Sequence, residues 1–138
     1  MRQATGEIEI RTRGKRLYEF TREIERWLDG QGMRTGLLTV FCRHTSASLV
    51  IQENADPDVQ ADLAAHFERA IPENGPYAHT IEGADDMPAH ICSALTGVNL
   101  SIPLIGGRLA LGEWQGIYLF EHRRSPHVRI VALHLMGE

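Results

Sequence analysis

The sequence predicts an α+β fold, in which residues 1–138 form a single compact domain with an antiparallel or mixed, β-sandwich-like sheet core flanked by about three helices. Three observations support this prediction. The expected elements follow the order strand, helix, two strands, two helices and a final run of short strands, and hairpin-connected strands favour antiparallel pairing over a doubly wound sheet. The chain has 138 residues, the usual size of one domain. Hydrophobic residues make up 43% and charged residues 23%, as in ordinary soluble domains.

The first half of the chain predicts three strands and one helix. Residues 3–12 alternate around Ile8 and Ile10, which is typical of a strand with one buried face. Apolar residues then recur at helical spacing, and this helix is expected to end in the glycine-containing segment 29–32. The residues of its apolar face are Leu17, Phe20, Ile24, Trp27 and Leu28. Residues 36–44 and 48–52 are rich in β-formers and are expected to lie in one sheet.

The second half predicts two helices and four strands. Asp56-Pro57 supplies an N-cap and a first-turn proline for a helix that buries Val59, Leu63 and Phe67 and ends at Pro72. Residues 71–83 form a loop, and a short helix follows from Asp86-Met87-Pro88 to Gly97. Its buried face is expected to hold Met87, Ile91 and Leu95. The closing strands are expected at residues 98–103, 108–112, 115–122 and 127–136.

The charge balance and the cysteines exclude several classes of function. Fourteen basic and eighteen acidic residues give a net charge of −4, so no basic field attracts nucleic acid. Lys15 is the sole lysine, which argues against a Schiff-base mechanism. The first ten residues, MRQATGEIEI, show no apolar h-region or cleavage site, so no signal peptide is expected, and no stretch approaches the roughly 20 apolar residues of a membrane span. Cys42 and Cys92 match no CxxC pattern and are expected to be reduced and buried, so the expected localisation is cytoplasmic, without a membrane partner.

Three histidines stand where they can meet. His44 ends a strand, His79 lies in the glycine-containing loop, and His90 falls in the first turn of the third helix. Imidazoles at a strand end, a loop and a helix start can converge on one pocket and hold a divalent metal, Zn or Mg, with a coordination position left for substrate. Their spacing matches no metal motif, so three separate hydrogen-bonded structural histidines are the alternative.

The remaining histidines are expected to have ordinary roles. His66 follows Asp62 by four residues on an exposed helix face, His122 and His127 are expected in solvent, and His134 is expected to be a hydrogen-bonded core residue.

Two further segments carry candidate binding groups. Thr45 and Ser46 place hydroxyls beside His44, as in a phosphate-binding or nucleophile loop, although Asp56 and Asp58 at the next helix start would repel an anion. Along the strand that follows Gly112-Glu113-Trp114-Gln115-Gly116, alternation puts Glu121 on the face of Ile117 and Leu119. A carboxylate buried there needs a histidine, an arginine or a metal as partner. No P-loop, GxGxxG or GxSxG pattern is present, so no nucleotide cofactor is expected.

Three segments together resemble a known family. They are RHTSASLVIQENADPDV, EGADDMPAHICSALTG and LSIPLIGGRLALGEWQGIYLFEHR, and with the closing strand they cover nearly the whole chain. The chain is similar in these segments to the YjbQ-like family, also called the secondary thiamine-phosphate synthase family. The resemblance implies a homotrimer of α+β domains. It also implies weak transferase activity that joins a hydroxymethylpyrimidine diphosphate to a thiazole phosphate with release of pyrophosphate.

The resemblance and the residue chemistry above together give the expected site residues. The family's histidines fall on His44, His79 and His90 as metal ligands, and catalysis is expected from His44, His79 and Glu121. The expected substrate or phosphate contacts are Thr45, Ser46, Asn54, Gly112, Trp114 and Gln115. Glu113 stands where the family usually has threonine, and an acid there would weaken phosphate binding.

Two other functions fit the same residues. One is metal-dependent hydrolysis of a small phosphorylated or ester substrate, and the other is a trimeric protein that binds a small ligand or metal without catalysis. An enzyme of either kind is expected to bring Glu121 and the histidines into one cavity.

Overall fold

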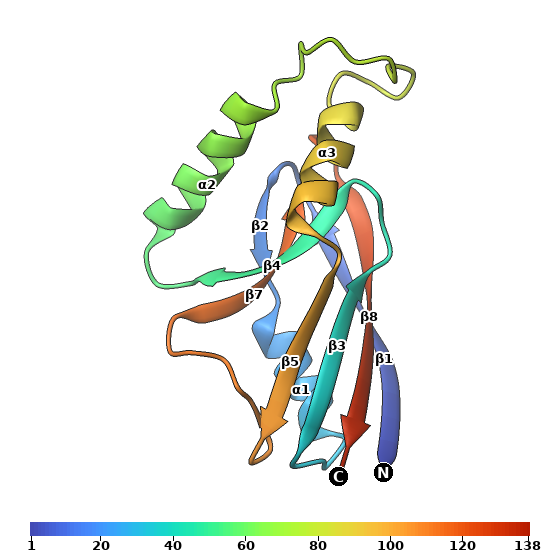
Figure 1. Ribbon diagram of the computed structural model, residues 1–138, viewed down its shortest axis with the longest axis vertical. Coiled ribbons are helices and arrows are strands. Elements are labelled where there is room, and N and C mark those ends of the chain that lie inside the picture. Colours follow the sequence, from blue (N-terminus) through green and yellow to red (C-terminus); the bar gives the residue numbers. More distant parts are fainter.

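The computed structural model describes residues 1–138 and contains eight strands and three helices (Figure 1). The helices are α1 (Thr21–Asp29), α2 (Pro57–Ala70) and α3 (Asp86–Thr96). The strands are β1 (Arg2–Thr12), β2 (Arg16–Glu19), β3 (Gly36–Cys42), β4 (Ala47–Glu53), β5 (Asn99–Ile105), β6 (Arg108–Leu109), β7 (Gln115–Glu121) and β8 (His127–Gly137).

Every strand pair is antiparallel, which confirms the α+β prediction and selects the antiparallel alternative. One sheet has five strands in the order β1-β8-β3-β5-β6, and the other has three in the order β2-β7-β4. Both ends of the chain lie side by side because β1 pairs with β8 along its length (Figure 1). No helix is both long and apolar enough to cross a membrane.

The main core lies between the two sheets and is closed by α1. The inward faces of the five-stranded sheet and of β7 meet there with the apolar stripe of α1, as the period-2 and period-3.6 patterns predict. Members of this cluster from the three sources are Leu38, Val40, Leu133, Leu135, Ile117, Leu119, Phe20, Ile24 and Leu28.

Strand β7 is covered on both faces, and this positions the site. Ile117 and Leu119 face the main core, whereas Tyr118 and Phe120 join a second apolar cluster with Leu17. Side chains of α2 pack against that second cluster. Glu121 follows on the core face and is fully buried, as alternation predicts.

Two local predictions are wrong. Residues 16–19 form strand β2 instead of the start of a helix, because Leu17 pairs with Phe120 of β7 and packs beside it, and α1 begins only at Thr21. In α3 the predicted face is also wrong, since Leu95 is exposed. The buried face carries Ala89, Cys92 and Ser93, and small residues there let α3 lie directly on β4, where the Ser93 hydroxyl donates to the Ala47 carbonyl.

Candidate metal centre

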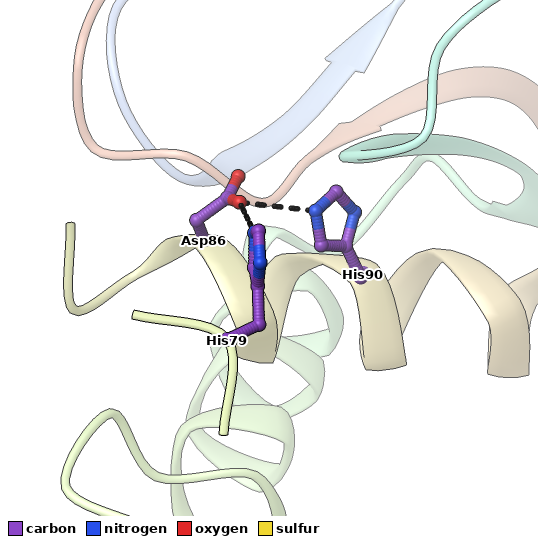
Figure 2. A group of neighbouring side chains, drawn as sticks. All are labelled: His79, Asp86 and His90. Atoms are coloured by element: carbon purple, nitrogen blue, oxygen red, sulfur yellow. Dashed lines mark hydrogen bonds and ion pairs between the residues drawn. The ribbon is translucent and has the colours of Figure 1, made fainter. Parts of the chain in front are cut away.

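Two histidines and one carboxylate meet at the start of α3. His79 comes from the loop before the helix, and Asp86 and His90 stand one turn apart on the same helix face (Figure 2). The Asp86 Oδ2 atom lies 2.7 Å from His79 Nε2 and 3.0 Å from His90 Nε2. All three atoms lie within 4.8 Å of one another. The Asp86 side chain is buried, while both imidazoles remain partly open to solvent.

Groups behind these side chains fix their orientation. The His90 Nδ1–H donates to the Thr45 carbonyl at 2.8 Å, so in the neutral ring the lone pair is on Nε2 and points at Asp86. On the other side, Arg123 Nη1 donates to Asp86 Oδ1 at 2.6 Å. Outer partners of this kind set the tautomer and aim of metal-binding histidines and carboxylates.

The Asp86 carboxylate is ionised at neutral pH. Burial acts to raise its pKa, but the hydrogen bond from His79 and the charges of His90 and Arg123 outweigh burial, so the pKa lies below its ordinary value. Asp85 is also buried, and the Arg124 amide and the Arg123 guanidinium likewise lower its pKa against the effect of burial. The centre therefore offers a fixed negative charge between two imidazoles.

The donor set fits a divalent metal of the zinc type. A neutral His90 ring has one N–H, which donates to the Thr45 carbonyl, so the lone pair of Nε2 faces the Asp86 carboxylate. Two lone-pair-bearing atoms face each other favourably only when a proton or a metal ion lies between them. Two imidazoles and one carboxylate are zinc ligands and leave a fourth position open. Mg²⁺ prefers all-oxygen sites, so this set favours zinc over the magnesium alternative.

His44 is predicted to join His79 and His90 as the third metal ligand, but it lies outside this group, and Asp86 is the third member instead. The His44 Nε2 accepts from the Ile130 amide at 2.7 Å, which leaves Nδ1–H as the donor of the neutral ring. Burial first, and then the Arg129 charge, lower the pKa of His44, so the ring is neutral at pH 7. His44, Thr45 and His90 line a common cavity of about 630 Å³. The sequence signal for Asp86 was its spacing of four from His90 on a predicted helix.

The predicted contacts around the Gly-x-Trp-Gln segment lie elsewhere. Asn54, Gly112 and Gln115 line a separate, polar cavity of about 560 Å³ that shares no residue with the cavity beside His90. The Gln115 Oε1 accepts from the Gly112 amide at 2.7 Å, and Trp114 is 57% exposed. A Cβ on Gly116 would lie 2.5 Å from Glu19 Oε2, so a larger residue there would displace the end of the Glu19 side chain.

Glu121 has an arginine as its partner. Arg129 Nε donates to Glu121 Oε1 at 2.8 Å, and the Thr12 hydroxyl donates to the same oxygen at 2.6 Å. Burial acts to raise the pKa of Glu121, but these hydrogen bonds and the Arg129 charge lower it overall. The Arg129 Nη2 also donates to the carbonyl and hydroxyl oxygens of Ser46. Glu121 accepts no hydrogen bond from a histidine ring and does not line the cavity of His44 and His90, so the geometry assigns it no proton transfer.

His122 is buried, and the prediction that it lies in solvent is wrong. It continues the β7 face of Tyr118 and Phe120, and its ring centroid lies 4.4 Å from that of Phe120, with the two ring planes tilted by 48°. Its Nε2 lies 2.8 Å from the Ser48 hydroxyl, and burial lowers its pKa to about 4. The sequence pattern that could have predicted this burial is the alternation along β7: one residue beyond its end, His122 falls on the same face as Tyr118 and Phe120.

Comparisons with known proteins agree on one family. The model of the UPF0047 protein YjbQ-like family matches residues 6–138. The chain is 54% identical to UPF0047 protein sll1880 of Synechocystis over 138 residues, covering 99% of this chain and 94% of that protein. It is 44% identical to UPF0047 protein YjbQ of Escherichia coli O157:H7 over 137 residues, covering 99% and 98%.

Solved structures give the same result for the fold. The crystal structure of the hypothetical protein APE1520 from Aeropyrum pernix is 32% identical, with a TM-score of 0.90 and coverage of 98% of this chain and 99% of that one. An uncharacterized YjbQ/UPF0047 protein from Clostridium acetobutylicum is 35% identical, with a TM-score of 0.88 and coverage of 94% and 98%. By sequence and by fold, the chain belongs to the UPF0047, YjbQ-like family.

Proposed function

We propose that this protein is a zinc-dependent enzyme that acts on a small phosphorylated molecule, with His79, Asp86 and His90 as the metal ligands. The observation that carries the proposal is the position of His90. Its Nδ1–H is committed to the Thr45 carbonyl, so its Nε2 faces the Asp86 carboxylate 3.0 Å away, beside His79. A divalent cation at this point would bind all three ligand atoms and take the place of any proton on the two imidazole Nε2 atoms.

A substrate pocket adjoins the metal ligands. The cavity of about 630 Å³ includes His90 in its lining and is bounded by Phe41, Arg43, His44 and Val98. Apolar side chains in this wall suit a flat ring, and the Arg43 guanidinium suits a phosphate group. The neutral His44 ring offers its Nδ1–H as a donor to a bound phosphate oxygen. This arrangement supports a role for His44 in substrate binding as a hydrogen-bond donor.

The reaction proposed first is group transfer, with the family resemblance as its support. A hydroxymethylpyrimidine diphosphate would lose pyrophosphate as its methylene carbon bonds to the nitrogen of a thiazole phosphate. A bound divalent metal neutralises negative charge on the departing diphosphate. The chain's own residues would hold the anion through Arg43 and through a hydrogen bond from His44 Nδ1–H, beside the apolar wall of the cavity.

Hydrolysis is the second candidate, because two imidazoles and one carboxylate are also the ligand set of several zinc hydrolases. Binding of a small ligand or metal without turnover is the third. In each case we propose self-association as a homotrimer. The outer face of the five-stranded sheet supports it, since large apolar side chains of β3 and β8 are exposed there. They are Leu37, Phe41, Val128 and Met136.

The test combines metal binding with turnover. Metal-free protein and His90→Ala would be titrated with Zn²⁺ by calorimetry, and the zinc-loaded protein assayed with the two thiamine precursors and with a simple phosphate ester. One zinc per wild-type chain, lost in His90→Ala, with pyrophosphate released only when both precursors are present, is the expected result. Phosphate release from the ester alone would select the hydrolase. Zinc binding without turnover would leave the non-catalytic function, and no zinc binding would overturn the proposal.

A further inference from the structure

We infer that the buried Arg129–Glu121 ion pair positions the two metal ligands of α3, Asp86 and His90, by holding the groups that bind them. The inference rests on the proposed function, since it concerns the same site. Neither side chain reaches His79, Asp86 or His90, so both act only through intermediate groups. Glu121 and Arg129 are among the most buried charged residues, at 0% and 3% exposure.

The first connection runs from Arg129 to His90. One guanidinium nitrogen, Nη2, donates to the Ser46 carbonyl at 3.2 Å and to the Ser46 hydroxyl at 3.0 Å. These bonds fix the turn between β3 and β4 at Ser46, the residue after Thr45. The Thr45 carbonyl then accepts the Nδ1–H of His90 and fixes the direction of the Nε2 lone pair. The position of this turn therefore sets the aim of one ligand.

The second connection runs from Glu121 to Asp86. The Glu121 Oε2 atom accepts the backbone N–H groups of His122 at 3.0 Å and of Arg123 at 3.2 Å, which fixes the chain after β7. From there the Arg123 side chain donates to Asp86 Oδ1 at 2.6 Å and to Asp85 Oδ2 at 3.1 Å. The same carboxylate thus holds the base of the arginine that orients the second ligand.

A purely structural role explains this arrangement less well. A buried ion pair is often no more stabilising than apolar side chains of similar volume, so burial alone does not account for it. Apart from the Thr12 hydroxyl, every partner of the pair lies in the two turns that carry the outer groups of the metal centre. Loss of such outer groups typically weakens metal binding by roughly 10–100-fold.

The experiment measures zinc affinity in Arg129→Met and Glu121→Gln, with Leu135→Ala as the matched control. Leu135 lies on the same strand as Arg129 and is fully buried, but it belongs to the apolar core and pairs with Leu38, toward the end of β3 away from the turn at Ser46. We expect the zinc Kd to rise roughly 10–100-fold in both charge variants and to stay at the wild-type value in Leu135→Ala, although all three lower the melting temperature. Cobalt-loaded protein would also show altered visible absorption in the charge variants alone.

Arg123→Met covers the case in which the charge variants do not fold, because Arg123 lies nearer the surface and its removal breaks only the second connection. It is expected to weaken zinc binding by roughly 10-fold. Wild-type zinc affinity and cobalt spectra in the folded variants would overturn the inference while leaving the proposed function intact. Failure of the wild-type chain to bind zinc would overturn both.

Discussion

Replacing Asp86 by asparagine tests the proposed metal centre at the carboxylate that faces both histidines. Asparagine keeps the shape and one acceptor for Arg123 but removes the charge that faces both imidazoles. Zinc binds four-ligand structural sites with about 10–16 kcal/mol, which is about 3 kcal/mol for each ligand. Loss of one ligand should therefore weaken zinc binding by more than about 100-fold.

The same substitution has a calculable effect on stability. Asp86 is buried and accepts hydrogen bonds from Arg123 and His79, and a hydrogen bond to a charged group is worth about 1.5–3 kcal/mol. The neutral amide retains part of this, and both histidines are partly exposed, so we expect a loss of about 2 kcal/mol. For a chain of this size that lowers the melting temperature of the metal-free protein by roughly 6–10 °C.

Asp85→Asn is the matched control. Asp85 is similarly buried and bonds to Arg123 and Arg124, but it contributes no atom to the ligand group. Calorimetric titration with Zn²⁺ and a thermal melt of each metal-free variant separate the two effects. We expect both variants to melt earlier and only Asp86→Asn to lose zinc affinity. Wild-type affinity in Asp86→Asn, or an equal loss in Asp85→Asn, would refute the assignment of Asp86 as a ligand.

Three further predictions follow from other parts of the structure. Burial lowers the pKa of His122 to about 4 from its ordinary 6.5, so the unfolded chain binds a proton at this histidine at a higher pH than the folded chain does. The free energy of unfolding should therefore fall by about 3 kcal/mol as the pH drops from 6.5 to 4. Urea unfolding of His122→Gln should not show this pH dependence. An unchanged pH dependence in this variant would contradict the neutral buried ring. Arg43→Ala should weaken binding of pyrophosphate to zinc-loaded protein by about 10-fold, whereas the exposed Arg11→Ala should not, as calorimetry can show. Phe41→Glu should convert a trimer to monomers in sedimentation equilibrium, while Ile81→Glu leaves it intact; a trimer in both would exclude this sheet face as the interface.

The strands were predictable because their signal is local. Alternation along β7 placed Ile117, Leu119 and Glu121 on one face, and all three are fully buried. The segment from Arg16 to Glu19 failed because its residues fit a helical period, and the competing effect is tertiary: Leu17 gains a strand partner in Phe120. Pairing partners that lie about 100 residues away in the chain leave no local trace.

The site was predictable only in part for the same reason. His79 and His90 were identified by residue type and by their place beside a helix start, and the structure brings them together with Asp86. The third member of the ligand group depends on how the turn at Thr45 packs against α3. That contact is tertiary, and no local sequence pattern predicts it. His44 is instead held by the Ile130 amide of β8. The Gly-x-Trp-Gln residues proved to line a different cavity, which the order of motifs along the chain could not reveal.

The most direct test of the central claim is anomalous X-ray diffraction at the zinc edge from crystals of the full chain grown with Zn²⁺. We expect one strong anomalous peak at the start of α3, with metal–nitrogen distances of about 2.0–2.1 Å to His79 Nε2 and His90 Nε2 and about 2.0–2.2 Å to Asp86 Oδ2. A fully occupied zinc elsewhere with none at these three atoms, or no bound zinc at all, would contradict the central claim.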